Sequence, residues 1–343
     1  MSVPTVRSGE LFIVGFKGAV IPPWVRRFES RYGLGGIILF DYDATADRYG
    51  NNVVSPGQVA ALCTEIRALR SKPLIFVDQE GGRVCRLKAS LGFAPLPSQA
   101  EFSQLPNEEK RTLAAASYRE LKSLGFHFNL APVVDLNLNP DNPDIGALGR
   151  AYSAHPAEVA ANVRLLDTVA RQVNLGLCLK HFPGLGGAAV SSHDEVTRLD
   201  GSIAEDQLDL FHTLGAEICG GAILVSHGIV DRWERATPVS LSTVALGSLR
   251  QRLPDVLLIS DDLQMEGLRK LFDLRSASIK GLRAGLDLLL IGNNLRDEQA
   301  QLESLAGWLE AAISRDRGLK MQYGAARDRV ARRKRQFYDG NPA

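Results

Sequence analysis

Short apolar segments recur along the whole chain and alternate with segments that have helical spacing. Each apolar segment is bounded by glycine, proline or polar residues, and almost every position within it is apolar. This pattern is typical of strands that are buried on both faces. We expect eight strands, at residues 11–16, 35–40, 73–77, 126–135, 175–179, 221–225, 256–260 and 286–291.

The segments between these strands predict helices. In residues 58–70, for example, Val59, Leu62 and Ile66 recur at intervals of three and four residues, which places them on one face of a helix. Further helices are expected at residues 22–32, 108–124, 156–174, 204–219, 244–252 and 276–284, and in a helical tail from about residue 295.

The order of these elements indicates the fold class. Apolar strands that alternate with helices are typical of a parallel sheet covered by helices. Eight such units, spread evenly along the chain, favour an α/β fold of the TIM type, a (β/α)8 barrel, over an open doubly wound sheet. No linker rich in proline or serine divides the sequence, so we expect residues 1–343 to form a single domain.

Composition limits the partners of this chain. Its 343 residues are 45% hydrophobic and 23% charged, with a formal net charge of +1, so neither a nucleic acid nor an anionic membrane is expected as a partner. The basic run Arg327–Arg335 lacks interleaved aromatic residues, and we interpret it as a solvated helix face. No signal peptide or membrane span is recognised, so a cytoplasmic location is expected.

Cysteine usage agrees with a reducing compartment. Cys63, Cys85, Cys178 and Cys219 are scattered through the sequence and form no Cys-x-x-Cys pair. We therefore expect neither a disulfide framework nor a zinc site built on these residues.

Polar residues follow six of the expected strands at the point where each strand ends. In a barrel of this type the catalytic groups lie at the carboxyl ends of the strands. A single aspartate after a strand is usually a helix N-cap, but six polar segments at one rim are not explained in this way. The pattern indicates an enzyme, and the segments are residues 78–83, 135, 180–181, 226–227, 261–262 and 292–294.

The segment Lys180–Glu195 combines reactive side chains with glycine. Lys180 and His181 follow the fifth apolar segment, and a loop rich in glycine then leads to a second histidine, His193. Glycine permits a backbone that approaches a ligand closely. A solvated loop between a strand and a helix is the simpler alternative for this segment alone.

The available side chains favour acid–base chemistry over metal or phosphate chemistry. His181 and His193 lack the spacing of an HExxH zinc motif, and no P-loop sequence occurs. A retaining glycoside hydrolase uses a carboxylate nucleophile and a separate proton donor, and this sequence offers both kinds of side chain. Because carboxylates at a barrel rim also bind divalent cations, a metal-dependent hydrolase stays open as an alternative.

Four motifs resemble those of glycoside hydrolase family 3, and in particular the bacterial β-N-acetylhexosaminidases of the NagZ type. They occur in the family's order from residue 11 to about residue 294, and the compact length resembles that of the single-domain members. The motifs are Lys180–Gly186 with Ser192-His193, Asp78–Val84 with Arg86, Ala131–Asp135, and Ser260–Met265.

The resemblance implies roles for individual residues. Asp261 corresponds to the nucleophile that forms a covalent glycosyl-enzyme, and His193 corresponds to the general acid/base. Asp262 is expected to orient its loop or cap a helix. A structural ion pair is the alternative for Arg150. The positions that bind the sugar correspond to Asp78, Arg86, Arg150, Lys180 and His181.

The activity implied by the resemblance is the removal of terminal β-linked GlcNAc from small glycans, with peptidoglycan fragments as the expected substrates. No cofactor and no metal are implied, the expected partner is a small glycan, and a monomer is favoured. Two alternatives stay open. One is a glycosyl-transfer or phosphorolytic variant, and the other is a non-catalytic relative that binds sugar.

The sequence departs from the family pattern at Leu185 and Ser191. Leu185 replaces a histidine of the family motif. Ser191 replaces an aspartate that pairs with the loop histidine in NagZ-type enzymes, and a serine supplies no negative charge. Asp194 or Glu195 could replace that carboxylate. We therefore predict an acid/base histidine with an unusual pKa and an altered or reduced activity.

Overall fold

A closed parallel barrel forms the centre of the molecule. The computed structural model describes residues 6–192, 195–201, 203–218 and 221–340. Within these ranges eight strands form one sheet in the order β11-β10-β9-β8-β5-β2-β1-β12. A parallel bridge between Ile259 and Leu288 joins its two end strands. The strands are β1 (Phe12–Val14), β2 (Gly36–Leu39), β5 (Leu74–Val77), β8 (Phe128–Asn129), β9 (Gly176–Phe182), β10 (Ala222–Val225), β11 (Leu257–Ser260) and β12 (Leu289–Ile291).

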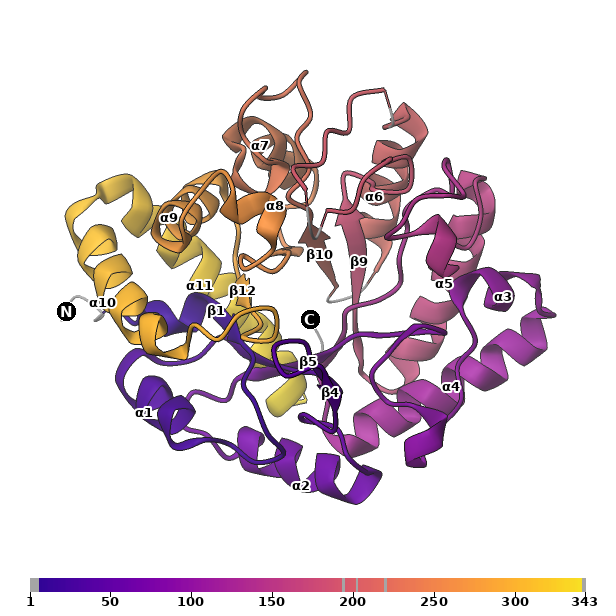
Figure 1. Cartoon of the computed structure of the whole chain (residues 1–343), viewed down its shortest axis with the longest axis horizontal. Helices are drawn as coiled ribbons and strands as arrows, with labels where there is room; N and C mark the ends of the chain where they lie inside the picture. Colours follow the sequence, from indigo (N-terminus) through magenta and orange to yellow (C-terminus); the bar gives the residue numbers. More distant parts are fainter. Residues whose placement is uncertain (1–5, 193–194, 202, 219–220, 341–343) are drawn as a thin grey trace.

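Helices surround these strands on the outside (Figure 1). A helix follows every strand of the barrel, which confirms the predicted (β/α)8 fold. The helices are α1 (Pro23–Tyr32), α2 (Pro56–Arg67), α3 (Gln99–Gln104), α4 (Asn107–Leu124), α5 (Pro156–Gln172), α6 (Glu205–Glu217), α7 (Thr243–Arg252), α8 (Glu266–Arg269), α9 (Leu274–Ala284), α10 (Gln299–Arg315) and α11 (Arg317–Tyr338).

Local sequence signals determine where several helices begin and end. Ser55 accepts a hydrogen bond from the Gln58 amide at the start of α2, and Asp273 accepts one from the Ser276 amide at the start of α9. Each bond satisfies an N–H group that has no partner within its helix. Gly125 ends α4 with φ of 104°, a conformation that residues with a Cβ rarely adopt.

Three details of the predicted elements were wrong. β9 does not end at Leu179 but continues through Lys180 and His181 to Phe182. The expected strand at residues 126–135 is reduced to β8 and a single bridge at Val133. Two short hairpins were not expected; they are β3 (Tyr42–Asp43) with β4 (Arg48–Tyr49), and β6 (Gln79–Gly81) with β7 (Val84–Cys85).

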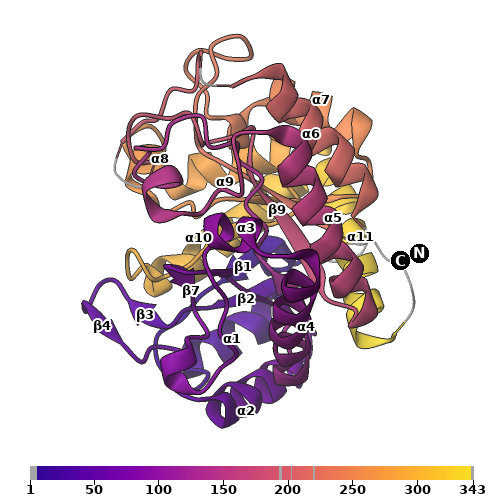
Figure 2. The same ribbon diagram turned by 90° about the vertical axis from the view of Figure 1, so that its right-hand side faces the viewer.

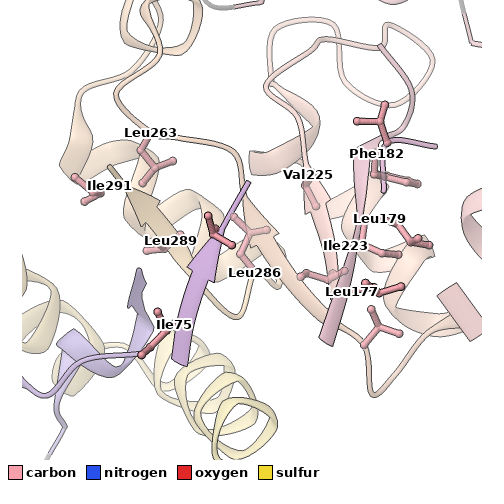
Figure 3. Packing of buried hydrophobic residues seen from close by; sticks show 14 of the residues in the cluster. Ile75, Leu177, Leu179, Phe182, Ile223, Val225, Leu263, Leu286, Leu289 and Ile291 are labelled. Carbon is pink, nitrogen blue, oxygen red and sulfur yellow. The ribbon is translucent and has the colours of Figure 1, made fainter. Parts of the chain in front are cut away.

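Successive side chains of each strand point to opposite sides of the barrel wall. On β5, Leu74 and Phe76 belong to an inner apolar cluster, whereas Ile75 and Val77 belong to the cluster packed against the helices. Figure 3 shows part of this outer cluster, with Ile75 among its members. The period of two residues then directs Asp78 toward the barrel mouth. The same phase holds for Lys180 after Cys178 and for Asp261 after Ile259.

Helix α11 crosses the opposite end of the barrel. The Lys334 ammonium donates hydrogen bonds to the carbonyl oxygens of Leu34, at 2.7 Å, and Ser71, at 2.8 Å. Leu34 precedes β2 and Ser71 precedes β5, so the helix lies against the amino ends of the strands. In Figure 2, α11 and the β3–β4 hairpin lie on opposite sides of the molecule.

The interpretation of residues 327–335 as a solvated face was wrong for part of that run. Arg329 donates to the buried Asp287 carboxylate at 2.7 Å, and Arg333 is 7% exposed and donates to the Asp255 carbonyl. Phe337 packs into the inner cluster, with its ring 5.1 Å from that of Phe128. The helical tail therefore closes the floor of the barrel.

Other sequence expectations concern membranes and thiols. No helix within the described ranges is long and apolar enough to cross a membrane. Cys63, Cys85 and Cys178 are buried free thiols, and Cys219 lies outside the described residues.

Replacing Phe337 by alanine tests the role of α11 as a floor. We expect Phe337→Ala to lower the free energy of unfolding by about 3 to 5 kcal/mol, because a buried aromatic ring is lost and a cavity is left. Met321→Ala is the matched control on the same helix, since Met321 is 64% exposed, and it should change stability by about 0.5 kcal/mol or less. Denaturant unfolding measures both, and equal midpoints would contradict the role of α11.

Candidate active site

A cavity of about 240 Å³ lies at the carboxyl ends of the strands. The apolar side chains of Leu224 and Leu290, which belong to the inner cluster, line part of it. All of the described residues that the sequence predicted for the site line the same cavity: Asp78, Arg86, Arg150, Lys180, His181 and Asp261. The predicted acid/base His193 lies outside the described residues, but Ser192 before it in the sequence lines the cavity.

Lys180 is buried between two carboxylates. Its ammonium lies 2.8 Å from Asp78 Oδ1 and 2.6 Å from Glu80 Oε1. Burial of an unpaired ammonium is costly, and two carboxylates at these distances offset that cost. The strand β9 can therefore continue with a lysine that points into the barrel mouth.

Glu80 was not predicted as a site residue. Its carboxylate forms a bidentate pair with the Arg150 guanidinium, at 2.8 Å from Nε and 2.7 Å from Nη2. Thus the structural ion pair considered for Arg150 is present, although Arg150 also lines the cavity. The signal available in the sequence was the spacing of Asp78 and Glu80, because residues two apart on an extended segment share one side.

Neighbouring charges stabilise the ionised forms of Asp78, Glu80 and Lys180. Burial by itself would raise the pKa of the Asp78 carboxyl, but the Lys180 and Arg86 charges lower it below its usual value. Burial likewise acts against the charged forms of Glu80 and Lys180. Arg150 and Lys180 nevertheless lower the pKa of Glu80, and Asp78 and Glu80 raise the pKa of Lys180. All of these groups are therefore ionised at neutral pH.

His181 is fixed by partners on both ring nitrogens. Nδ1 lies 2.7 Å from Asp135 Oδ2, and Nε2 lies 3.2 Å from Arg150 Nη2. Because a carboxylate accepts and a guanidinium donates, the ring donates from Nδ1 and accepts at Nε2. Asp135 Oδ1 also accepts from the backbone N–H groups of His181 and Leu185. Asp135 thus orients both the ring and the start of the following loop.

Arg86 lies at the edge of this network. Its guanidinium is 3.5 Å from Asp78 Oδ2 and 3.6 Å from Asp41 Oδ1, and a quarter of its side chain is exposed. Asp41 also pairs with Lys88. A partly exposed guanidinium that lines the cavity can donate to a bound oxygen atom.

Asp261 and Asp262 follow β11 but have different surroundings. The Asp262 amide donates to Asp261 Oδ1 at 2.9 Å, which fixes the orientation of that carboxylate. The Asp262 carboxyl instead accepts from the backbone amides of Gln264 and Gly292. Burial raises the pKa of Asp262 to about 7, against the effect of these two amides, and the charge of Asp261 also raises it. Asp262 therefore orients the loop after β11.

His227, which follows β10, also supports this loop. Its Nδ1 lies 2.7 Å from Ser240 Oγ, and its Nε2 lies 3.1 Å from the Asp262 carbonyl oxygen. Among the described residues, no group of three or more His, Cys, Asp or Glu side chains is placed to hold a metal ion.

The loop after β9 lies against the segment after β8. A Cβ on Gly186 would lie 1.8 Å from the Leu136 carbonyl oxygen, so only glycine allows this approach. The Asn142 amide donates to the carbonyl oxygens of Leu185, at 2.7 Å, and Ala188, at 3.0 Å. The loop is thus docked on the barrel rim by hydrogen bonds to its backbone.

Ser191 and Glu195 have partners in different parts of the chain. The Ser191 hydroxyl donates to Asp144 Oδ1 at 2.7 Å. The Glu195 carboxylate lies 3.2 Å from the Lys270 ammonium, near α8. Of the two carboxylates considered as replacements for the family aspartate, Glu195 is therefore engaged with Lys270, and Asp194 lies outside the described residues.

The glycosyl hydrolase family 3 N-terminal domain model matches residues 24–320. The chain belongs to this family. Two relatives are named β-hexosaminidase: one from Methylococcus capsulatus strain Bath, 33% identical over 82% of each chain, and one from Thiobacillus denitrificans, 34% identical over 80% of this chain and 76% of the relative. This protein is therefore a glycoside hydrolase of family 3.

Solved structures agree with this assignment. A family 3 β-N-acetylglucosaminidase from Paenibacillus sp. FPU-7 superposes with a TM-score of 0.86 at 25% identity. The match covers 100% of this chain but 64% of the Paenibacillus chain, so this hydrolase spans less than two thirds of that protein. LpqI of M. tuberculosis superposes with a TM-score of 0.80 at 26% identity, and the match covers 99% of this chain and 94% of that one.

Replacing Glu80 by glutamine tests whether the buried ion pairs of Glu80 contribute to the stability and the activity of this family 3 hydrolase. We expect Glu80→Gln to lower the free energy of unfolding by about 3 to 5 kcal/mol, because Arg150 loses its charged partner in a buried position. The same change should lower kcat/KM, since Lys180 then has one carboxylate partner instead of two.

The matched control is Glu217→Gln, which removes the same charge from an exposed bidentate pair with Arg164. That change should cost about 1 kcal/mol or less and leave kcat/KM unchanged. Thermal unfolding and steady-state kinetics of both variants measure the difference. Equal losses in the two variants would show that burial of the Glu80 network has no special role.

Proposed function

We propose that this family 3 hydrolase is a retaining, exo-acting β-N-acetylhexosaminidase. It removes terminal β-linked GlcNAc from small glycans, and peptidoglycan fragments are the substrates we propose. The observation that carries the proposal is that Asp261, Asp78 and Lys180 line one cavity at the carboxyl ends of the barrel strands.

Asp261 is the proposed nucleophile. Its carboxylate attacks the anomeric carbon as the bond from that carbon to the leaving oxygen breaks, which gives a covalent glycosyl-aspartate. The hydrogen bond from the Asp262 amide holds one carboxylate oxygen in place. Asp261 is also less buried than Asp262, and burial keeps the pKa of Asp262 near 7, so Asp262 is the weaker candidate at neutral pH.

His193 is the proposed general acid and base. It protonates the leaving oxygen in the first step. In the second step it takes a proton from the water that attacks the anomeric carbon as the bond to the Asp261 carboxylate breaks. Because each of the two displacements inverts the anomeric carbon, its configuration is retained overall. The support comes from the family motif and from Ser192, the preceding residue, which lines the cavity.

The ion network is the proposed sugar-binding surface. Asp78 is ionised and accepts hydrogen bonds from ring hydroxyls, while Lys180 and Arg86 donate to hydroxyl oxygens. Arg150 and His181 complete this side of the cavity. Since the cavity ends on the apolar barrel interior, it fits the end of a glycan better than its middle.

The names of the relatives support the choice of sugar. The two relatives described above are named β-hexosaminidase, and the Paenibacillus structure is that of a β-N-acetylglucosaminidase. We therefore expect hydrolysis of an aryl β-N-acetylglucosaminide with a kcat/KM at least about tenfold above that of the matched β-glucoside. Kinetics on the two substrates measures this preference, and a preference for the glucoside would contradict the proposed substrate class.

Removal of Asp261 tests the proposed mechanism. We expect Asp261→Asn to lower kcat/KM by on the order of 10⁴-fold, because the covalent step loses its nucleophile. In Asp261→Gly, added azide should restore turnover and yield the glycosyl azide of inverted configuration, since azide then attacks from the face that the carboxylate occupied. NMR of the product identifies the anomer.

The control for this test is Asp255→Asn. Asp255 precedes the same strand at the floor of the barrel and forms an exposed pair with Arg332, so its replacement should leave kcat/KM unchanged. Turnover that survives in Asp261→Asn would reject the mechanism. Formation of a sugar phosphate in phosphate buffer would indicate phosphorolysis, and binding of GlcNAc without any turnover would indicate a sugar-binding protein.

A further inference from the structure

The loop that leads to His193 is bound by a carboxylate from another part of the chain. Asp144 lies in the segment between β8 and α5 and is 8% exposed. Its Oδ1 accepts from the Ser191 hydroxyl at 2.7 Å. Its Oδ2 accepts from the Ser192 amide at 2.7 Å and from the Ser192 hydroxyl at 2.8 Å. Three hydrogen bonds to one carboxylate fix the orientation of this contact.

Asp144 is itself fixed in position. Its amide donates to Asn142 Oδ1 at 2.8 Å, and its carbonyl oxygen accepts from Arg150 Nη1 at 2.7 Å. Arg150 is in turn held by Glu80. The carboxylate is therefore connected through a rigid series of contacts to the sugar-binding network, and both Asp144 and Ser192 line the cavity.

This contact places a carboxylate against the two residues that directly precede His193 in the sequence. The bonded groups are the Ser191 hydroxyl and the amide and hydroxyl of Ser192. Two other charged groups near this contact have partners among the described residues. Glu195 pairs with Lys270 at 3.2 Å, and Arg150 pairs with Glu80. Asp144 is thus the carboxylate that the described structure brings to the segment before the histidine.

We propose that Asp144 is the positioning residue for the acid/base His193. It supplies, from the segment after β8, the negative charge that Ser191 cannot supply. Ser191 and Ser192 act as the connectors that bind this charge to the loop. This inference rests on the proposed function, because it assigns a partner to the proposed acid/base.

A set of four variants separates charge from anchoring. Asp144→Asn removes the charge but keeps an oxygen that can accept from Ser191. Ser191→Asp adds a second carboxylate next to the first, which creates repulsion between like charges. The double variant Asp144→Asn with Ser191→Asp moves one charge from residue 144 to residue 191. Asp141→Asn is the matched control, because Asp141 is exposed in the same segment.

We expect both single variants to lose activity and the double variant to regain most of it. In Asp144→Asn, kcat/KM for an alkyl β-N-acetylglucosaminide should fall by about 10²-fold or more, because its poor leaving group requires protonation. The loss for a dinitrophenyl glycoside should be about tenfold or less, since that leaving group departs without a proton. Asp141→Asn should match the wild type on both substrates.

Histidine titration provides a second readout that needs no turnover. The ring resonances of His193 are assigned by comparison with His193→Gln, and its pKa is measured by NMR. We expect Asp144→Asn to lower the pKa of His193 by about one unit, because a neighbouring carboxylate stabilises the imidazolium. The double variant should restore it.

The two readouts distinguish failure of this inference from failure of the proposed function. If no variant, including the wild type, cleaves a β-N-acetylglucosaminide, the proposed function is rejected and the NMR titration still tests the role of Asp144. If Asp144→Asn loses equal activity on both leaving groups, leaves the pKa of His193 unchanged and is not rescued by Ser191→Asp, then Asp144 only anchors the loop and the inference is overturned.

Discussion

The site depends on the burial of a lysine between two carboxylates. Lys180 can occupy the inward side of β9 only because Asp78 and Glu80 compensate its charge at 2.8 and 2.6 Å. Two carboxylates surround one ammonium, and Arg150 balances the remaining negative charge by pairing with Glu80. Arg150 also contacts the His181 ring and donates to the Asp144 carbonyl oxygen. These contacts join β9 and the segments that follow β5 and β8 into one polar surface. A change to one member therefore affects the position of the others.

The barrel places this polar surface at the end of an apolar interior. Alternate residues of the strands fill the interior with apolar side chains. Helix α11 closes the far end with Phe337 and with Lys334, which donates to carbonyl oxygens of residues that precede β2 and β5. The cavity is thus open at one end and rests on a packed floor. Charge-assisted hydrogen bonds are stronger in such an environment than in bulk water, which favours recognition of a polar and uncharged ligand such as a sugar.

Binding and proton transfer are assigned to different kinds of backbone in the function we propose. The proposed sugar-binding residues Asp78 and Lys180 lie on or directly after strands, where the ladder of hydrogen bonds fixes them. The proposed acid/base lies on a loop, and a loop needs contacts of its own to hold a side chain in place. Asn142 and Asp144 supply such contacts to the described part of that loop.

The sequence by itself determined the barrel, the order of its strands along the chain and the polar residues at their ends. The reason is that the spacing of apolar residues and the contiguous motifs are local properties of the chain. It did not determine partners that are distant along the chain. Glu80 with Arg150, Asp144 with Ser191 at 47 residues' separation, and Lys334 with Leu34 at 300 all arise from packing. A hydrogen bond depends on where two segments meet in space, and only the tertiary structure decides that.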